Sequence, residues 1–293
     1  MVPHDLNVDL HMHSTASDGT LSPEELVARG AANGVQIMAL TDHDTLDGLA
    51  RARAAAADYG VQFFNGVEIS VTWGGETLHM VGLDFDDQHP ALAGNLRQVA
   101  ASRFERARAM DQGLMAVGLP SIFDEAMAYA GNPNLIGRAH FARAMVARGI
   151  CSHMQAVFDQ YLTPGHPGYV PHEWSSLSQA MDWVHQAGGF TVLAHPARYR
   201  INATAHWALI QEFMSLGGKT IEVATGSHSL DETRRYQRLS IELGLMASRG
   251  SDFHCPKESR CDVGQAPVLP CGTLPVWAGY PERFGLNTGV TSH

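Results

Sequence analysis

The chain has 293 residues, of which 45% are hydrophobic and 17% charged, and its formal net charge is −10. This composition is typical of a globular protein and argues against disorder. The negative charge argues against broad binding of duplex DNA, but it still allows a small nucleotide to bind in a locally positive cleft. No apolar run approaches the roughly 20 residues that a membrane span needs, and the N-terminus lacks a signal-peptide pattern, so we expect a cytoplasmic protein without membrane contact.

Short apolar stretches alternate with helical stretches in the first part of the chain. The first helix has clear boundaries, since Ser22 and Glu25 form a capping box around Pro23 and Gly34 follows the last turn. Gly74 and its neighbour Gly75 predict an antiparallel hairpin between the last two strands. The expected strands are residues 7–13, 35–43, 61–73 and 76–86, and the expected helices are residues 22–34 and 45–60.

The middle of the chain has helical patterns only, and the last third resumes the alternation. Alternation at this spacing predicts a largely parallel α/β sheet or barrel, into which the central helices are inserted. We expect the tail from residue 255 to 293, which is rich in Pro and Gly, to wrap the surface. The expected organisation is a first barrel part at 1–89, a helical insertion that caps the substrate at 90–165, and a second barrel part with the tail at 166–293.

Polar residues follow or occupy six of the expected strands. In (β/α) barrels the active site lies at the C-terminal ends of the strands, so these residues are expected to converge on one rim. His11 and His13 are two residues apart and point to one face of a strand, as do Asp252 and His254. The candidate ligands are His11, His13, Asp18, His43, Glu68, His79, His195, Asp252 and His254.

Six histidines and three carboxylates form too large a set for one ion, which takes about four to six ligands. They predict a cluster of two or three divalent ions about 3.5–4 Å apart, bridged by Glu68. Mixed imidazole and carboxylate ligands suit manganese, zinc or iron and do not suit calcium. Three divalent ions and three carboxylates leave such a site positive, so we expect it to bind a phosphate ester and to attack it with a metal-bound hydroxide.

The motifs that carry these residues resemble the PHP (polymerase and histidinol phosphatase) family. They are Asp9–Gly19, Thr41–Asp44, Gly66–Glu68 with His79, Ala194–Pro196 and Ser251–His254. The resemblance implies a distorted (β/α)7 barrel with a helical insertion, the nine ligands named above, and a phosphoesterase site with two or three metal ions. Manganese is the expected metal, with zinc or iron as alternatives.

Within that family, the start SDGTLSPEELV and the inserted segments SRFERA and IGRAHFARAMV are most similar to the branch that hydrolyses nucleoside 3′,5′-bisphosphates at the 3′-phosphate. Adenosine 3′,5′-bisphosphate would give AMP and phosphate. The alternatives are a 5′→3′ exonuclease on short RNA, a phosphatase of another small phosphomonoester such as histidinol phosphate, and a non-enzymatic metal-binding interaction module. The expected partner is a small nucleotide, and the oligomeric state stays open.

Arginines of the insertion are candidates to hold the phosphate that is not cleaved, because a guanidinium gives a phosphate two parallel hydrogen bonds. Arg106 and Arg108 are expected to lie on a solvated helix face, and Phe104 or Tyr199 either stacks on a base or belongs to the core. The substrate-binding candidates are Ser102, Arg103, Phe104, Glu105, Gly137, Arg138, His140 and Arg198.

The catalytic candidates are His195, Asp18 and His254. The leaving ribose oxygen is expected to take its proton from His195, Asp18 or a metal-bound water, although a coordinated histidine is a poor donor. The remaining histidines are expected on the surface or in loops; they are His4, His89, His153, His166, His172, His185, His206, His228 and His293.

Overall fold

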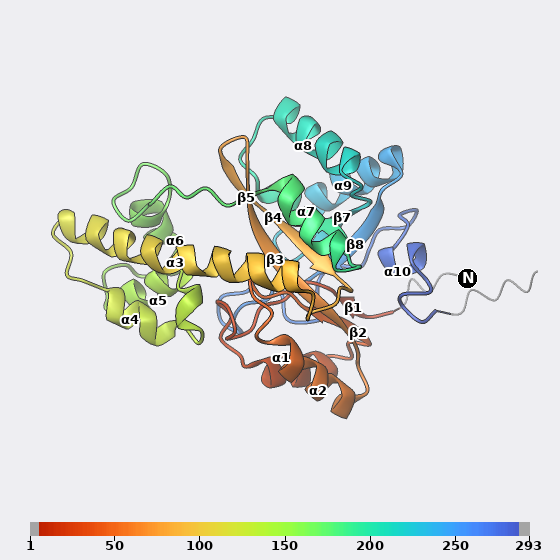
Figure 1. The fold of residues 1–293 in the computed structure, drawn as a ribbon, viewed down its shortest axis with the longest axis horizontal. Coiled ribbons are helices and arrows are strands. Elements are labelled where there is room, and N and C mark those ends of the chain that lie inside the picture. Colours follow the sequence, from red (N-terminus) through yellow and green to blue (C-terminus); the bar gives the residue numbers. More distant parts are fainter. Residues whose placement is uncertain (1–5, 287–293) are drawn as a thin grey trace, which may run out of the picture.

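The structure is a computed structural model that describes residues 6–286. Its sheet runs in the order β1-β2-β3-β4-β6-β7-β8 and curves into a barrel (Figure 1). The Leu10 N–H donates to the Arg249 carbonyl at 3.0 Å, which joins the segment after β1 to β8 and closes the ring. The strands are β1 (Val8–Asp9), β2 (Ile37–Leu40), β3 (Gln62–Trp73), β4 (Glu76–Leu83), β6 (Phe190–Leu193), β7 (Thr220–Thr225) and β8 (Met246–Gly250).

The barrel is distorted because one strand runs against the others. β4 pairs antiparallel with β3 and with β6, whereas the other neighbouring pairs of the ring are parallel. The predicted Gly74–Gly75 turn joins β3 to β4, and both glycines have positive φ (58° and 83°), as a tight hairpin requires. A short strand, β5 (Ser175–Ser176), pairs with β3 outside the ring. The predicted distorted (β/α)7 barrel is therefore confirmed.

Helices cover the outside of the barrel, and the predicted helix ends are present. Ser22 and Glu25 form the capping box of α1, and Gly60 ends α2 in the left-handed conformation. Glycine takes that conformation without the strain that a Cβ atom causes. The covering helices are α1 (Pro23–Ala32), α2 (Leu49–Tyr59), α7 (Leu177–Gln186), α8 (Ala203–Ser215) and α9 (Leu230–Leu243). None of the helices within residues 6–286 combines the length and apolar composition of a membrane span.

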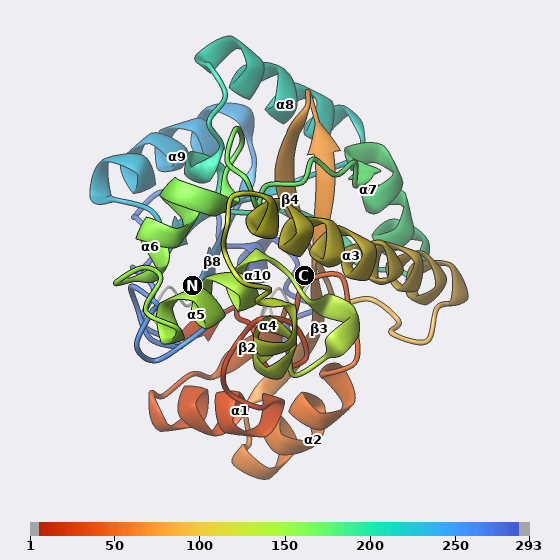
Figure 2. The same ribbon diagram turned by 90° about the vertical axis from the view of Figure 1, so that its left-hand side faces the viewer.

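The inserted helices lie across one end of the barrel (Figure 2). Met110 and Leu114 belong to a hydrophobic core that the insertion builds for itself, whereas Leu92 and Leu96 of the same helix pack into the barrel core. Helix α3 thus takes part in both units, and the boundaries 1–89, 90–165 and 166–293 stay a prediction. The inserted elements are α3 (Pro90–Ala116), α4 (Phe123–Tyr129), the 3-10 turn Pro133–Leu135, α5 (Arg138–Ala147), α6 (Met154–Val157) and the π turn Phe158–Leu162.

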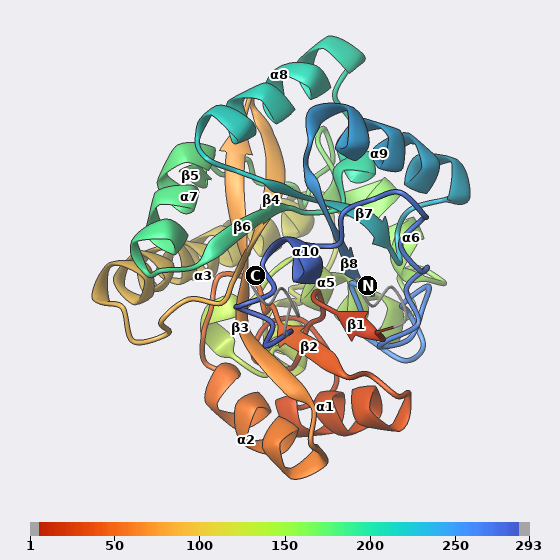
Figure 3. The same cartoon turned by 90° about the vertical axis from the view of Figure 1, so that its right-hand side faces the viewer.

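The tail runs over the outside of the barrel as expected, and within residues 255–286 it also adds buried side chains to the barrel core. Ala247 of β8 bridges to Pro275, and Val263, Trp277 and Phe284 are at most 2% exposed. Figure 3 shows α10 (Val276–Gly279) at the barrel end opposite the insertion. These apolar side chains cover core that would otherwise be open to water, which holds a segment rich in Pro and Gly against the barrel.

Candidate metal centre

The Glu68 carboxylate lies at the barrel end that the insertion covers, in the middle of a ring of imidazoles. Its Oε1 is 2.8 Å from His195 Nε2 and 2.9 Å from His79 Nδ1. Its Oε2 is 3.0 Å from His43 Nδ1 and 3.2 Å from His13 Nε2. One carboxylate thus faces histidines from four different strands or strand ends, as expected for a bridging ligand.

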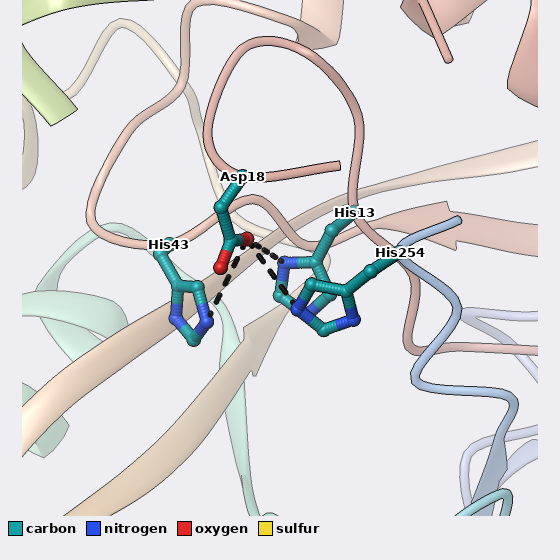
Figure 4. A group of neighbouring side chains, drawn as sticks. All are labelled: His13, Asp18, His43 and His254. Carbon is teal, nitrogen blue, oxygen red and sulfur yellow. Dashed lines mark ion pairs between the residues drawn. The ribbon is translucent and has the colours of Figure 1, made fainter. Parts of the chain in front are cut away.

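Asp18 faces a second side of the same cluster. Figure 4 shows its carboxylate directed at three imidazoles that come from separate parts of the chain. Asp18 Oδ1 is 3.4 Å from His254 Nε2, 3.9 Å from His13 Nδ1 and 4.0 Å from His43 Nε2. The loop after β1 therefore brings the carboxylate of Asp18 back toward His13.

Asp252 completes the cluster from the end of β8. Its Oδ1 is 3.4 Å from His13 Nε2 and 3.6 Å from His11 Nε2. All nine predicted ligands thus meet at one place, and eight of them form three groups whose donor atoms lie within 4.8 Å of one another. The groups are His13–Asp18–His43–His254, His11–His13–Glu68–Asp252 and His43–Glu68–His79, with His195 beside the last through Glu68.

Several donor atoms in this cluster are buried without a hydrogen-bond partner. A buried polar atom without a partner costs about 1–3 kcal/mol. A cluster of such atoms in one place therefore points to a bound group that they share. Imidazole nitrogens and carboxylate oxygens together suit divalent first-row ions. The residues fit two or three such ions. The atoms are His11 Nε2, both ring nitrogens of His13, His43 Nδ1, His195 Nδ1, Asp18 Oδ1, Glu68 Oε2 and Asp252 Oδ1.

The electrostatics of the cluster favour cations. Burial acts to raise the pKa of Glu68, but the neighbouring histidines hold it well below its ordinary value. Burial acts to lower the pKa of His13, but contacts with Asp252 and Glu68 raise it to about 10. Burial lowers the pKa of His195 to about 4, with a smaller contribution from Arg198. The carboxylates thus stay ionised and attract positive charge, which protons or metal ions can supply.

The backbone around the cluster is held in an unusual conformation. His195 and Asp252 have positive φ (23° and 53°), which costs a non-glycine residue about 1–3 kcal/mol. Asp42 fixes the loop that carries Asp18, because its carboxylate accepts hydrogen bonds from the Ser14 N–H (2.8 Å) and the Ser17 hydroxyl (2.6 Å). The surrounding fold therefore determines where the ligands lie.

A cavity of about 630 Å³ joins the cluster to the insertion. This volume is in the range of small-molecule sites. Six of the nine candidate ligands line it on the barrel side, and apolar side chains such as Leu135 and Phe158 line it on the insertion side. Seven arginines also line it; they are Arg103, Arg106, Arg138 and Arg143 of the insertion and Arg198, Arg200 and Arg260 of the barrel.

Only four of the eight predicted substrate-binding residues line this cavity: Arg103, Gly137, Arg138 and Arg198. The structure places the other four elsewhere, because the face of each helix depends on how the insertion packs. The Ser102 hydroxyl donates to the Val99 carbonyl at 2.6 Å, and Glu105 is exposed. Phe104 packs edge-on against Phe123, and His140 Nδ1 accepts from the Gly137 N–H at 3.0 Å.

Arg106 was expected on a solvated helix face, and the structure contradicts this. Arg106 is 9% exposed, donates through Nε to the Val170 carbonyl at 3.1 Å and lines the cavity. Burial, together with the charges of Arg138 and Arg103, lowers its pKa to about 9. Within residues 6–286, neither Arg106 nor Arg138 has a carboxylate partner. Arg108 is exposed, as expected.

Arg103 has such a partner. It contacts the buried carboxylate of Asp44, to which its Nε donates at 3.1 Å, and it donates to the Ser70 hydroxyl at 3.0 Å. Its guanidinium also lies over the Trp174 ring, 4.6 Å from the centroid. Arg103 therefore joins the insertion to the barrel, and its charge is largely balanced before any substrate binds.

Sequence reasoning overlooked several residues of the site. Arg143 donates to the Asp18 carbonyl at 2.7 Å and to Glu258 at 2.9 Å, and it was not among the candidates although it lies in the segment IGRAHFARAMV. Glu222 lies beneath the cluster, and the one charged residue within the strand sequence TIEVAT was the signal that could have found it. Arg200 and Arg260 were also missed.

Three aromatic residues outside the ligand set have structural roles. The Tyr199 hydroxyl lies 2.6 Å from the Ala194 carbonyl and accepts from the His79 N–H at 3.1 Å, which favours the core alternative. His206 and His228 are buried, contrary to expectation: His206 Nε2 lies 3.1 Å from the Pro196 carbonyl, and His228 Nδ1 lies 3.2 Å from that of Val223. His4 and His293 lie outside the described residues.

The PHP domain family matches residues 9–226. A 3′,5′-nucleoside bisphosphate phosphatase of Chromobacterium violaceum is 49% identical over 278 residues, which are 95% of this chain and 98% of that protein. A 5′-3′ exoribonuclease of Haemophilus influenzae is 40% identical over 278 residues, which are 94% of this chain and 98% of that protein. A solved amidohydrolase structure from Chromobacterium violaceum, with sulfate and no metal, is 49% identical, covers 94% of this chain and 96% of that chain, and has a TM-score of 0.91.

These matches extend over the barrel and the insertion alike. They agree with the seven-stranded ring and with the cluster of donors at one of its ends. The resemblance of the sequence motifs is confirmed, and the chain belongs to the PHP domain family.

Proposed function

We propose that this chain is a metal-dependent phosphatase that removes the 3′-phosphate from nucleoside 3′,5′-bisphosphates. One observation carries the proposal: a single cavity holds both the cation donors and two arginines of the insertion, Arg106 and Arg138, that have no carboxylate partner within the described residues. A substrate with two phosphates matches these two positive regions. The Chromobacterium violaceum relative, a 3′,5′-nucleoside bisphosphate phosphatase, supports the same substrate.

The two ends of the cavity divide the substrate between them. The ligand end binds the phosphate that is cleaved, and Arg106 and Arg138 bind the other phosphate through paired N–H donors. Leu135 and Phe158 line the insertion side and offer the nucleoside an apolar surface. The cavity wall thus has few apolar side chains and many positive charges, which suits a small, highly charged nucleotide.

When bound, divalent ions supply positive charge to the phosphate and make a water molecule nucleophilic near neutral pH. The water oxygen forms a bond to phosphorus, the bond from phosphorus to the 3′-oxygen breaks, and that oxygen takes a proton. His254 Nδ1 lies 2.9 Å from the Asp252 carbonyl, so it carries hydrogen and leaves Nε2 free as a ligand. His195 Nε2 lies 2.8 Å from Glu68 Oε1, a separation that suits two ligands of one ion. His195, His254 and Asp18 therefore act as ligands, and solvent supplies the proton.

The proposed cofactor is two or three divalent ions, with manganese as the first choice and zinc or iron as alternatives. Glu68 belongs to two donor groups and has two oxygens, so it would join neighbouring ions, whereas His13 and His43 would each bind one ion through one ring nitrogen. The sites accept several first-row ions, and cellular supply often decides which one is bound. A cytoplasmic location is part of the same proposal.

A 5′→3′ exonuclease acting on short RNA is the second candidate function. Arg198, Arg200 and Arg260 line the barrel side of the cavity and could bind further backbone phosphates. The Haemophilus influenzae relative, a 5′-3′ exoribonuclease, supports this alternative. Histidinol phosphate has one phosphate and needs fewer positive contacts. A metal-binding interaction module would not need two unpaired arginines beside the ligands.

Release of phosphate and of mononucleotides from a panel of substrates tests the proposal. Purified protein with added manganese is given adenosine 3′,5′-bisphosphate, AMP, histidinol phosphate and a 5′-phosphorylated oligoribonucleotide. The proposal expects the highest kcat/KM for the bisphosphate, with AMP and phosphate as the products. Faster release of mononucleotides from the oligonucleotide would favour the exonuclease, and turnover of none of them would contradict an enzyme of this class.

A further inference from the structure

Glu222 is a buried carboxylate in β7, directly beneath the metal centre. It is 1% exposed, and every residue of β7 is buried. A carboxylate without access to water costs several kcal/mol unless donors surround it. Glu222 has such donors, and both belong to predicted metal ligands.

The two oxygens of Glu222 contact two different ligand residues. Oε1 lies 2.8 Å from His11 Nδ1. Oε2 accepts the backbone N–H of His195 at 2.5 Å. His11 follows β1 and His195 follows β6, so one side chain of β7 joins ligand-bearing segments from both sides of the barrel interior.

The contact with His11 determines its tautomer. An ionised carboxylate only accepts hydrogen bonds, so His11 Nδ1 must carry the hydrogen. The neutral ring then has its lone pair on Nε2, which lies 3.3 Å from Glu68 Oε1 and 3.6 Å from Asp252 Oδ1 within one donor group. A carboxylate that holds the far nitrogen of a ligating histidine orients the ring and makes it a stronger ligand.

The contact with His195 holds a strained turn. His195 has a φ of 23°, outside the common regions for a residue with a Cβ atom. The hydrogen bond from its N–H to Glu222 stabilises the turn that directs Nε2 at Glu68, 2.8 Å away. Without this bond, the turn would lose a partner for a buried N–H.

We propose that Glu222 is a positioning residue of the metal centre, which holds His11 as the Nδ1–H tautomer and the His195 turn in place and thereby strengthens metal binding. This inference rests on the proposed function, since it assumes that the nine donors bind metal. Glutamine cannot replace Glu222, because its amide has only one acceptor oxygen. That oxygen can accept from one of the two donors, and the amide NH₂ group then faces the second donor. Aspartate is one methylene shorter and would not reach both.

The test is manganese binding by Glu222→Gln, measured by titration of the metal-free protein and by metal content after dialysis against a chelator. The variant is expected to bind at least one ion about 10–100-fold more weakly, the usual effect of losing such a partner. Thr220→Val is the matched control, since Thr220 is buried two residues earlier on β7 and its hydroxyl has no partner among the described residues. It should bind manganese like the wild type.

A second measurement does not depend on the Glu222 variant. Nitrogen-15 NMR of histidine-labelled wild-type protein, loaded with zinc, reports the tautomer of His11, whose signals are identified by their loss in His11→Gln. The proposal expects the hydrogen of His11 on Nδ1. It is overturned if the hydrogen is on Nε2, or if a folded Glu222→Gln variant binds manganese like the wild type. If the wild type itself binds no metal, the proposed function fails instead.

Discussion

Glu68 and His195 lie 127 residues apart in the sequence, yet Glu68 Oε1 is 2.8 Å from His195 Nε2. Two ligand atoms that each lie about 2.0–2.2 Å from one ion are roughly 3 Å apart, so this distance suits a shared cation. The barrel produces the contact, because it closes in a ring and sets the end of β6 near β3 across β4. The same geometry brings the other ligands to Glu68.

Removal of the Glu68 charge should weaken the whole cluster. Glu68→Gln keeps the shape of the side chain but loses the charge that faces several histidines, so we expect loss of bound metal and a fall in kcat/KM of at least about 100-fold. Metal analysis and phosphate release measure the two effects. Glu212→Gln is the control, since Glu212 is an exposed partner of Trp73 and should change neither. A Glu68→Gln variant with full metal content would contradict the bridging role.

Arg106 should matter for substrate binding and not for metal binding. Arg106→Ala removes a buried charge that faces the cavity, and loss of one partner of a buried charged contact typically costs about 2–5 kcal/mol. We expect KM for the bisphosphate to rise about 30-fold or more, with metal content unchanged. Arg108→Ala, two residues along the same helix, is the control because Arg108 is exposed. Equal kinetics for both variants would remove Arg106 from the phosphate site.

Arg103 should matter mainly for stability. Arg103→Met leaves the buried carboxylate of Asp44 without its cation, and such a change typically costs about 3–5 kcal/mol of the free energy of unfolding. The double variant Arg103→Met with Asp44→Asn should recover much of this loss, because the unpaired charge is gone. Urea denaturation of the single and double variants measures both. A stable Arg103→Met with a raised KM would instead favour the predicted contact with substrate.

Metal-free protein should lose stability as the pH rises. The pKa of His13 is raised to about 10 in the metal-free fold, above the value of about 6.5 for an unfolded chain. Its protonation therefore stabilises the fold fully below about pH 6.5, and this contribution is lost as the pH rises toward 10. We expect the Tm of chelator-treated protein to fall from pH 7 to 9 relative to the metal-loaded protein, in which His13 is neutral. Parallel pH curves for the two forms would contradict this.

The convergence of the nine candidate ligands was predictable because of where they lie along the chain. Pairs such as His11 and His13 share one face of a strand, and residues at the ends of parallel strands meet at one rim whatever the details of packing. The capping box at Ser22 and the glycine hairpin were predictable for a similar reason, since each depends on local geometry alone.

The cavity wall was not predictable, because it depends on how the insertion packs against the barrel. Arg106 and Arg108 look alike in the sequence, yet one faces the cavity and the other faces water. Phe104 turns into the core of the insertion for the same reason. Glu222 was missed because its role depends on contacts with His11 and His195, both far away in the sequence.

The most direct test is anomalous diffraction from crystals of the wild-type protein grown with manganese. We predict two or three manganese peaks among the donor groups around Glu68, His13 and His43, with the imidazoles and carboxylates directed at them. Crystals with ample manganese and no peak at this end of the barrel, or with these side chains turned away from one another, would contradict the account.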